Sequence, residues 1–256
     1  MAPSFFLARG WCRRRTPGPV LPATGDKVRG TLVNVAAVLI GSGVGLAIGG
    51  RLPERMQRII TTGLGLSTLL IGVQMALKAQ NILVVIASMV LGGVLGEWAG
   101  IETGLERAGE RLKAWARAGS GTFVAGFVTA SLLFCVGPMT IVGSIQEGTS
   151  GNPEVIYAKS MLDGAASVAF ASSLGVGVSF AAVTVFVVQG ALTLLGAQLA
   201  FLLRPELLNE LTAAGGLLIL AISLLLLDVK RIPVANLLPA LVVVVALTAG
   251  RLALGW

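Results

Sequence analysis

Eight stretches of mainly apolar residues, each about long enough to cross a lipid bilayer, are the dominant feature of this 256-residue sequence. A transmembrane helix needs about 20 such residues, and it is stable in lipid because it satisfies its own backbone hydrogen bonds. Only 12% of the residues are charged, against about 25% in an ordinary soluble domain. The sequence therefore predicts an all-α, polytopic bundle of seven or eight spans that has the lipid bilayer as its partner. The predicted spans are 31–50, 60–78, 82–98, 122–145, 160–180, 182–203, 212–228 and 233–254.

The sequence contains no histidine, which removes the commonest general base and the imidazole-ligated metal sites. Its two cysteines, Cys12 and Cys135, lie in unlike contexts. No nucleophile and base stand at a spacing that suggests catalysis. We therefore expect no enzyme activity and no cofactor, and the sequence does not decide whether a metal binds.

Residues 1–27 differ from the rest of the chain, because they hold four prolines and several basic residues but no long apolar run. This composition favours a disordered N-terminal extension over a signal peptide. The membrane pattern begins three residues after Val28, so we hypothesise that native translation starts there. We then expect one transmembrane domain over 28–254. Its basic residues are scattered at the ends of spans, which does not favour nucleic-acid binding.

Basic residues in the short loops predict the orientation, because they concentrate on the cytoplasmic side of a membrane. With eight spans and a start at residue 28, nine Lys and Arg residues fall on one side and five on the other. We expect the loops at 51–58 and 99–121 to face the cytoplasm, in the inner membrane of a bacterium. The polar stretch 99–121 mixes charges with apolar residues and predicts an amphipathic interfacial helix; a solvated linking helix is the alternative.

A weak internal repeat appears when the chain is shifted by 100 residues. Gly43 then aligns with Gly143, and the Pro-Glu pair at 53–54 aligns with the pair at 153–154. The predicted units, about 31–98 and 122–203, hold three spans each, so the second is inverted relative to the first, as in many secondary transporters. The helices over 212–254 would be an addition. Chance alignment of glycine-rich apolar sequence is the alternative.

Glycines recur every four residues in the first and third predicted spans. Such spacing lets helix backbones approach closely in lipid. We expect these faces to pack within the protomer or to form a homo-oligomer. The glycines are Gly41, Gly45 and Gly49 in one span and Gly92, Gly96 and Gly100 in the other.

Gly137 and Pro138 interrupt the fourth predicted span. Proline removes a helical hydrogen bond, and freed backbone groups at membrane depth are tolerated only against protein or a water-filled cavity. The pair indicates either a discontinuous helix at a binding site or a plain kink.

Few ionisable residues lie inside or beside the predicted spans, and these residues, with three polar ones, form the predicted site. Asp163 is costly in lipid and is expected to face the bundle interior. Ser160, Asp163 and Ser167 share one helix face, and Lys159, four residues before Asp163, is its expected counter-ion. The full set predicted to bind an ion or solute is Asn34, Glu97, Glu147, Lys159, Ser160, Asp163 and Ser167.

Several short motifs are spread over residues 28–254. They are Asn34 with Ala37-Val38-Leu39, the stretch Arg51 to Arg55, Phe134 to Gly143, Glu147-Gly148, Gly151-Asn152-Pro153, Ala158-Lys159-Ser160, Leu162-Asp163, Gly215-Gly216 and Asn236 to Ala240. With these motifs the chain resembles the YqgA/YdfK-like family of bacterial integral membrane proteins, a domain-of-unknown-function family. The resemblance implies a polytopic inner-membrane protein, loosely described as a transporter, and supplies no substrate.

Together these features predict a membrane protein that moves an unknown cation or small solute through a polar site between the two repeat units. The alternative is a scaffold or regulatory membrane protein that transports nothing, in which the polar groups only lock helices together.

Overall fold

The computed structural model describes residues 28–116, 121–230 and 232–254, and these residues form helices and connecting turns with no β-strand. The predicted disorder of residues 1–27 lies outside the described residues. The helices follow the chain in this order: α1 (Arg29–Gly49), α2 (Glu54–Ala76), α3 (Ile82–Ala99), α4 (Ile101–Trp115), α5 (Phe123–Val136), α6 (Pro138–Ser150), α7 (Glu154–Leu174), α8 (Gly177–Leu194), α9 (Gly196–Leu199), the 3₁₀ helix η1 (Ala200–Leu203), α10 (Pro205–Leu226), the 3₁₀ helix η2 (Val234–Leu237) and α11 (Pro239–Ala253).

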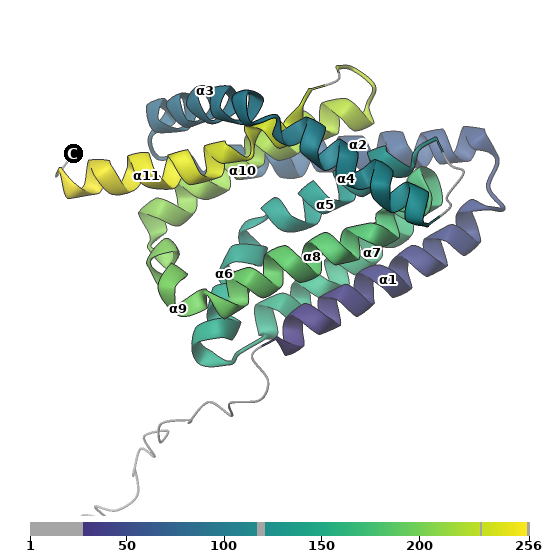
Figure 1. The fold of residues 1–256 in the computed structure, drawn as a ribbon, viewed down its shortest axis with the longest axis horizontal. Coiled ribbons are helices and arrows are strands. Elements are labelled where there is room, and N and C mark those ends of the chain that lie inside the picture. The colour runs from purple at the N-terminus through teal and green to yellow at the C-terminus, as the bar shows by residue number, and fades with distance from the viewer. Residues whose placement is uncertain (1–27, 117–120, 231, 255–256) are drawn as a thin grey trace, which may run out of the picture.

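The all-α transmembrane bundle is confirmed. Within the described residues, six segments are long and apolar enough to cross a membrane, namely α1, α2, α3, α8, α10 and the stretch Val234–Ala253. The pair α5 and α6 makes a seventh if it counts as one bent span. The charges of α7 lower its apolar character, although it lies alongside α1 in the bundle (Figure 1). Packing against α1 therefore contributes to the place of α7 in the bundle.

The helices arrange in pairs that join the two halves of the chain. α1 packs mainly on α7, α2 on α10, and α3 on α11, while α5 and α8 pair beside them (Figure 1). Each helix of the first predicted repeat unit thus meets a partner from beyond residue 150. The repeat itself stays a prediction.

The glycine faces explain how closely these pairs approach. A Cβ added to any of five glycines of α1 and α3 would collide with backbone of the partner segment. Both faces are therefore used inside the chain, and a homo-oligomer would need another surface. The collisions are Gly41 with Gly164, Gly45 with Val168 and Gly49 with Ser172 between α1 and α7, and Gly92 with Ala240 and Gly96 with Asn236 at the other pair. Residue numbers rise together in the first set, so α1 and α7 run parallel. Gly100, predicted to belong to the second face, instead lies just beyond the end of α3, and a Cβ there would meet nothing within 4 Å.

The helix boundaries correct four predicted spans. The predicted span 160–180 is shifted, because α7 begins at Glu154 and ends at Leu174, before Gly175 with a φ of 81°. That backbone conformation favours glycine, so the chain turns there into α8. The predicted span 60–78 begins six residues too late, since α2 starts directly after Pro53 with charged residues in its first turn. α8 begins five residues before the predicted span 182–203 and ends at Leu194, where the short helices α9 and η1 follow. α10 begins seven residues before the predicted span 212–228, directly at Pro205.

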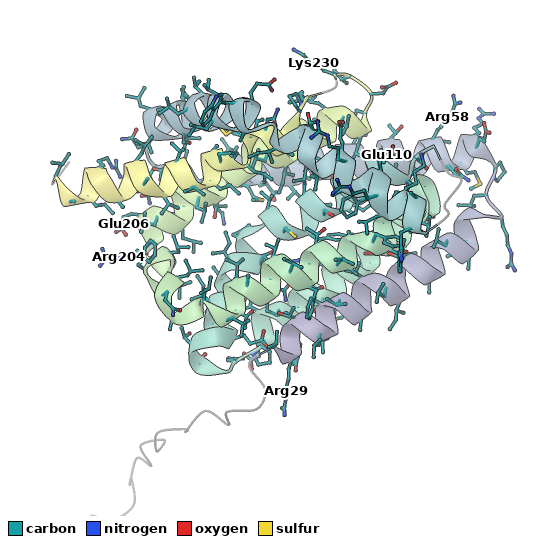
Figure 2. The ribbon with its side chains drawn as sticks, viewed as in Figure 1. Arg29, Arg58, Glu110, Arg204, Glu206 and Lys230 are labelled. Atoms are coloured by element: carbon teal, nitrogen blue, oxygen red, sulfur yellow. The ribbon has the colours of Figure 1, made fainter. Side chains whose placement is uncertain are left out.

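Charged side chains gather at the ends of the bundle and along α4. Figure 2 shows Arg29, Arg204 and Glu206 toward one end and Arg58 and Glu110 toward the other. The predicted amphipathic helix over 99–121 is found as α4. The apolar core runs between α1, α5, α7 and α8 and includes Val38, Phe134, Phe170, Val178 and Val185.

Candidate functional site

The centre of the candidate site is an ion pair inside the bundle. The Lys159 ammonium contacts the Asp163 carboxylate four residues later on α7. Asn34 of α1 donates an amide hydrogen bond to the same carboxylate oxygen, Oδ2, at 3.0 Å. Asn34 is fully buried, and Lys159 and Asp163 are 4% and 8% exposed. The structure therefore brings together three of the predicted site residues, which come from two parallel helices.

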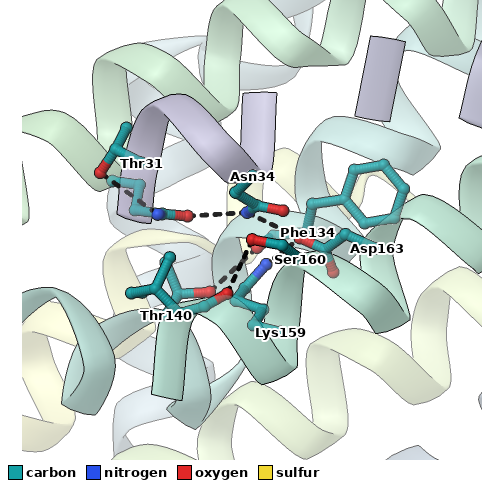
Figure 3. Close-up of polar contacts among 9 residues, drawn as sticks. Thr31, Asn34, Phe134, Thr140, Lys159, Ser160 and Asp163 are labelled. Atoms are coloured by element: carbon teal, nitrogen blue, oxygen red, sulfur yellow. Dashed lines mark hydrogen bonds and ion pairs between the residues drawn. The ribbon is translucent and has the colours of Figure 1, made fainter. Parts of the chain in front are cut away.

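Gln189 of α8 and Thr31 of α1 extend this cluster. Asn34 Nδ2 also donates to Gln189 Oε1 at 2.9 Å, and Gln189 Nε2 donates to the Thr31 hydroxyl at 3.2 Å (Figure 3). Gln189 and Thr31 are missing from the predicted site. Each is a neutral polar residue in an apolar span, where a helix-to-helix hydrogen bond is the ordinary role, so the sequence carries no signal that separates them from other such residues.

The break between α5 and α6 borders the cluster. The two helices meet at Gly137 and Pro138 with a bend of 58°, so the helix is interrupted at the predicted pair, as a broken span or a re-entrant loop. Pro138 has no N–H to donate to the carbonyl of Phe134. The Thr140 hydroxyl donates to that carbonyl instead, at 2.9 Å. The Lys159 ammonium lies 6.0 Å from the centre of the Phe134 ring (Figure 3), within the range of a cation–π contact.

Glu147 was predicted to bind an ion or solute, but its hydrogen bond is to the start of α1 and not to Asn34 or Asp163. Its Oε1 accepts the backbone N–H of Gly30 at 2.5 Å, at the first turn of α1. A carboxylate is favourable there because the unpaired N–H groups of a helix N-terminus carry partial positive charge. Glu147 is 1% exposed, and among the described residues its Oε2 has no hydrogen-bond partner. Glu147 therefore holds the start of the helix that carries Asn34.

The two predicted serines lie on the same buried face of α7 as Asp163. The Ser160 hydroxyl donates back to the carbonyl of Ile156 at 2.7 Å. Ser167 lies against Gly41 of α1, and its hydroxyl oxygen has no hydrogen-bond partner among the described residues. The shared face was predicted correctly, although neither hydroxyl bonds to the ion pair.

Glu97 belongs to a second polar cluster at the junction of α3, α4 and η2. Asn236 donates to Glu97 at 2.6 Å and accepts the backbone N–H of Glu102 at 2.7 Å. Glu102 in turn accepts the N–H of Ala235 at 2.7 Å. Glu97 is therefore not part of the site around Asp163. Burial raises the pKa of Glu102, against the opposing effect of its hydrogen bond from Ala235.

Neither of the two described cavities opens on the ion pair. The larger, about 610 Å³, lies beside α4 and is lined by Glu102, Glu106 and Asp228 with apolar residues of α5 and α10. The smaller, about 350 Å³, is lined by apolar residues of α1 and α8 and by Ser179. Asn34 and Asp163 line neither of them, and both residues are buried.

The groups of the site are suited to hold a single cation against the Asp163 carboxylate. The cluster offers carboxylate, amide and hydroxyl oxygens, which are the ligands of hard cations. Among the described residues, no group of three or more His, Cys, Asp or Glu is placed to hold a metal ion. The arrangement thus suits one positive charge against one carboxylate, a place that the Lys159 ammonium now fills.

The apolar helices, the broken span and the buried ion pair define a multi-pass α-helical membrane protein. The sequence profile of a family described as "Protein of unknown function (DUF554)" matches residues 29–249, and the chain belongs to this family.

Two relatives match nearly the full length of the chain. The "Uncharacterized protein YqgA" of Escherichia coli (strain K12) is 33% identical over 227 residues, which cover 87% of this chain and 97% of that protein. The "Uncharacterized membrane protein YdfK" of Bacillus subtilis (strain 168) is 28% identical over 218 residues, which cover 84% of this chain and 93% of that protein. No solved structure matches. The family and the membrane character predicted from the sequence are thus confirmed.

Proposed function

We propose that the protein transports a cation or small solute across the inner membrane of a bacterium, through the site formed by Asn34, Lys159 and Asp163. The observation that carries the proposal is the buried ion pair beside the break between α5 and α6. Ionisable residues inside a membrane are costly and in most cases serve function. Broken helices at membrane depth are the usual setting of transporter sites.

The placement of the site supports this function. Asn34, Lys159 and Asp163 come from α1 and α7, which would belong to different units of the proposed inverted repeat. Sites at the interface of two repeats can open to either side as one unit moves against the other. The buried, paired state then corresponds to a conformation between the two openings.

The direct test is flux through purified protein in liposomes, surveyed over a panel of ions and small solutes. The Asp163→Asn variant keeps the size of the side chain but removes its charge, and we expect it to abolish the flux. Glu154→Gln is the matched control, since it makes the same chemical change on an exposed position of the same helix. Unchanged flux in Asp163→Asn, with normal folding, would remove this site from the mechanism.

A second candidate function is a scaffold or regulatory protein that transports nothing. It is favoured by the pairing of the buried groups and by the absence of the ion pair from the linings of the two described cavities.

The two candidate functions predict different access of water-soluble reagents to the site. In a variant without Cys12 and Cys135, the Ser167→Cys thiol should react with a small, water-soluble thiol reagent if the site opens to water. A thiol on an exposed position, Ser150→Cys, is the control for labelling. A transporter predicts reaction at both positions, and a scaffold predicts reaction at residue 150 alone.

A further inference from the structure

We propose that the transported species is a monovalent cation, and that each cation is exchanged for one proton released by Lys159. This inference rests on the proposed function and adds the substrate class and the coupling. Its basis is that the Lys159 ammonium already occupies the position on Asp163 that a transported cation would take.

The geometry makes Lys159 a tethered competitor for the carboxylate. Lys159 stands one helical turn before Asp163, so its ammonium reaches the carboxylate without any movement of the backbone. The lysine and aspartate side chains are 5% and 11% exposed. Two positive charges beside one buried carboxylate would be costly in this environment. Arrival of a cation therefore requires Lys159 to lose either its contact or its charge.

Oxygen atoms for the incoming cation are present beside the carboxylate. The amide of Asn34 bonds to Asp163 through its nitrogen, and its oxygen Oδ1 is buried without a hydrogen-bond partner among the described residues. An unpartnered buried carbonyl of this kind carries an energetic penalty. A bound cation would remove that penalty by accepting both Asn34 Oδ1 and the Asp163 carboxylate as ligands.

The charge of the site selects a monovalent ion. Asp163 supplies one negative charge, and Glu147, the acidic side chain of α6, is engaged with the N–H of Gly30. A divalent ion at Asp163 would leave one net positive charge buried. A monovalent ion replaces the ammonium charge for charge.

The exchange step balances in atoms and charge. The contact between Lys159 Nζ and Asp163 Oδ2 breaks, and the oxygen–cation contacts form. One N–H bond of the ammonium breaks, the electron pair stays on Nζ, and the proton leaves to the water on the side from which the cation came. The site holds one positive and one negative charge before and after. Release of the cation on the opposite side, with uptake of a proton there, restores the ion pair.

Few other titratable groups face the pair. Cys135 of α5 lies within electrostatic range of both Lys159 and Asp163, and Glu147 is the acidic residue of α6. α8 has no charged residue and contributes Gln189. Arg29 and Glu154 stand at the first positions of α1 and α7. The charged residues of α2, which begins at the opposite end of α7, are Glu54, Arg55 and Arg58.

The experiment measures cation uptake and internal pH together in proteoliposomes under a sodium or potassium gradient. We expect the wild-type protein to move about one proton out of the liposome for each cation that it takes in, so that the internal pH rises. Lys159→Arg keeps the positive charge, but arginine does not deprotonate at accessible pH, so we expect exchange to fall about tenfold or more. Lys230→Arg, the same change at an exposed position, should leave exchange unchanged.

A second variant keeps the test decisive if arginine does not fit. Lys159→Gln removes the competing charge and the proton together, and we expect it to take up the cation with no pH change and with less dependence on external pH. Exchange in Lys159→Arg equal to wild type, or proton release that persists in Lys159→Gln, would overturn the inference. If the wild type moves a cation without a proton and Asp163→Asn abolishes that flux, the exchange is wrong and the transport proposal stands. If the wild type moves no cation, both fail.

Discussion

Two polar clusters in this bundle are built around an asparagine, and they balance charge in different ways. In the interior cluster, Asn34 bonds to Asp163 and Gln189, and the negative charge is met by Lys159. In the cluster at the junction of α3, α4 and η2, which we call the junction cluster, Asn236 bonds to Glu97 and to the backbone of Glu102. In the junction cluster, the Glu102 carboxylate accepts a hydrogen bond from the backbone N–H of Ala235, whereas the Asp163 carboxylate is paired with the Lys159 ammonium.

The difference follows from the surroundings. Glu97 lies near the end of α3 and is exposed, and Glu102 accepts the N–H of Ala235. Asp163 is buried in the bundle, and an isolated charge there would be far more costly. A full positive charge is needed inside, whereas partial charges suffice at the edge. The interior cluster is therefore the one that can exchange a cation.

The largest effect is expected from breaking the interior ion pair on one side. Asp163→Leu leaves the Lys159 ammonium buried without its partner and should lower the free energy of unfolding by about 3–5 kcal/mol. The double variant Lys159→Met/Asp163→Leu replaces both charges by apolar groups and should recover most of that loss. Unfolding in detergent measures both. A double variant as unstable as the single one would show that Asp163 acts through Asn34 rather than through Lys159.

An intermediate effect is expected from removing the asparagine of each cluster. Asn34→Ala and Asn236→Ala each leave buried hydrogen-bonding groups unpaired and should cost about 1–3 kcal/mol of unfolding free energy. Flux should separate them, because only Asn34 contacts the proposed site. Equal loss of flux in both variants, at equal protein stability, would remove the functional distinction between the clusters.

The smallest effect is a pH dependence that arises at the junction cluster. Burial raises the pKa of Glu102 above its ordinary value of about 4.5, so the folded state binds its proton more tightly than the unfolded state. The contribution of Glu102 to stability is then greatest below about pH 4.5 and declines as the pH rises through the raised pKa. Thermal unfolding over this range should give a flatter profile for Glu102→Gln than for the wild type. A wild-type profile identical to that of the variant contradicts the assignment.

The helices themselves could be predicted because their signals are local. Runs of apolar residues gave the spans, and the missing N–H of Pro138 placed the break between α5 and α6. The boundary of α7 was predicted poorly, because its first turns carry Glu154 and Lys159 and do not look like a membrane span. Packing against α1 outweighs that composition.

The membership of the site could be predicted only in part. Lys159 and Asp163 are four residues apart on one helix, so their pairing follows from helix geometry. Glu97, Glu147 and Asp163 are all carboxylates in or beside a predicted span, and the sequence does not show which of them share a site. The partners of Glu97 and Glu147, Asn236 and Gly30, lie 139 and 117 residues away, and no local pattern indicates such contacts.

The sequence by itself determined that this chain is a helical membrane protein, which of its helices is broken, and that one face of α7 carries a lysine and an aspartate in register. These properties depend on composition and on the period of the helix, which neighbouring residues define. Only the tertiary structure decided that Asn34, 129 residues before Asp163, completes the ion pair, and that Glu147 holds the start of α1. Those contacts depend on how closely α1 and α7 approach, and that distance is set when Gly41, Gly45 and Gly49 meet the backbone of the facing helix.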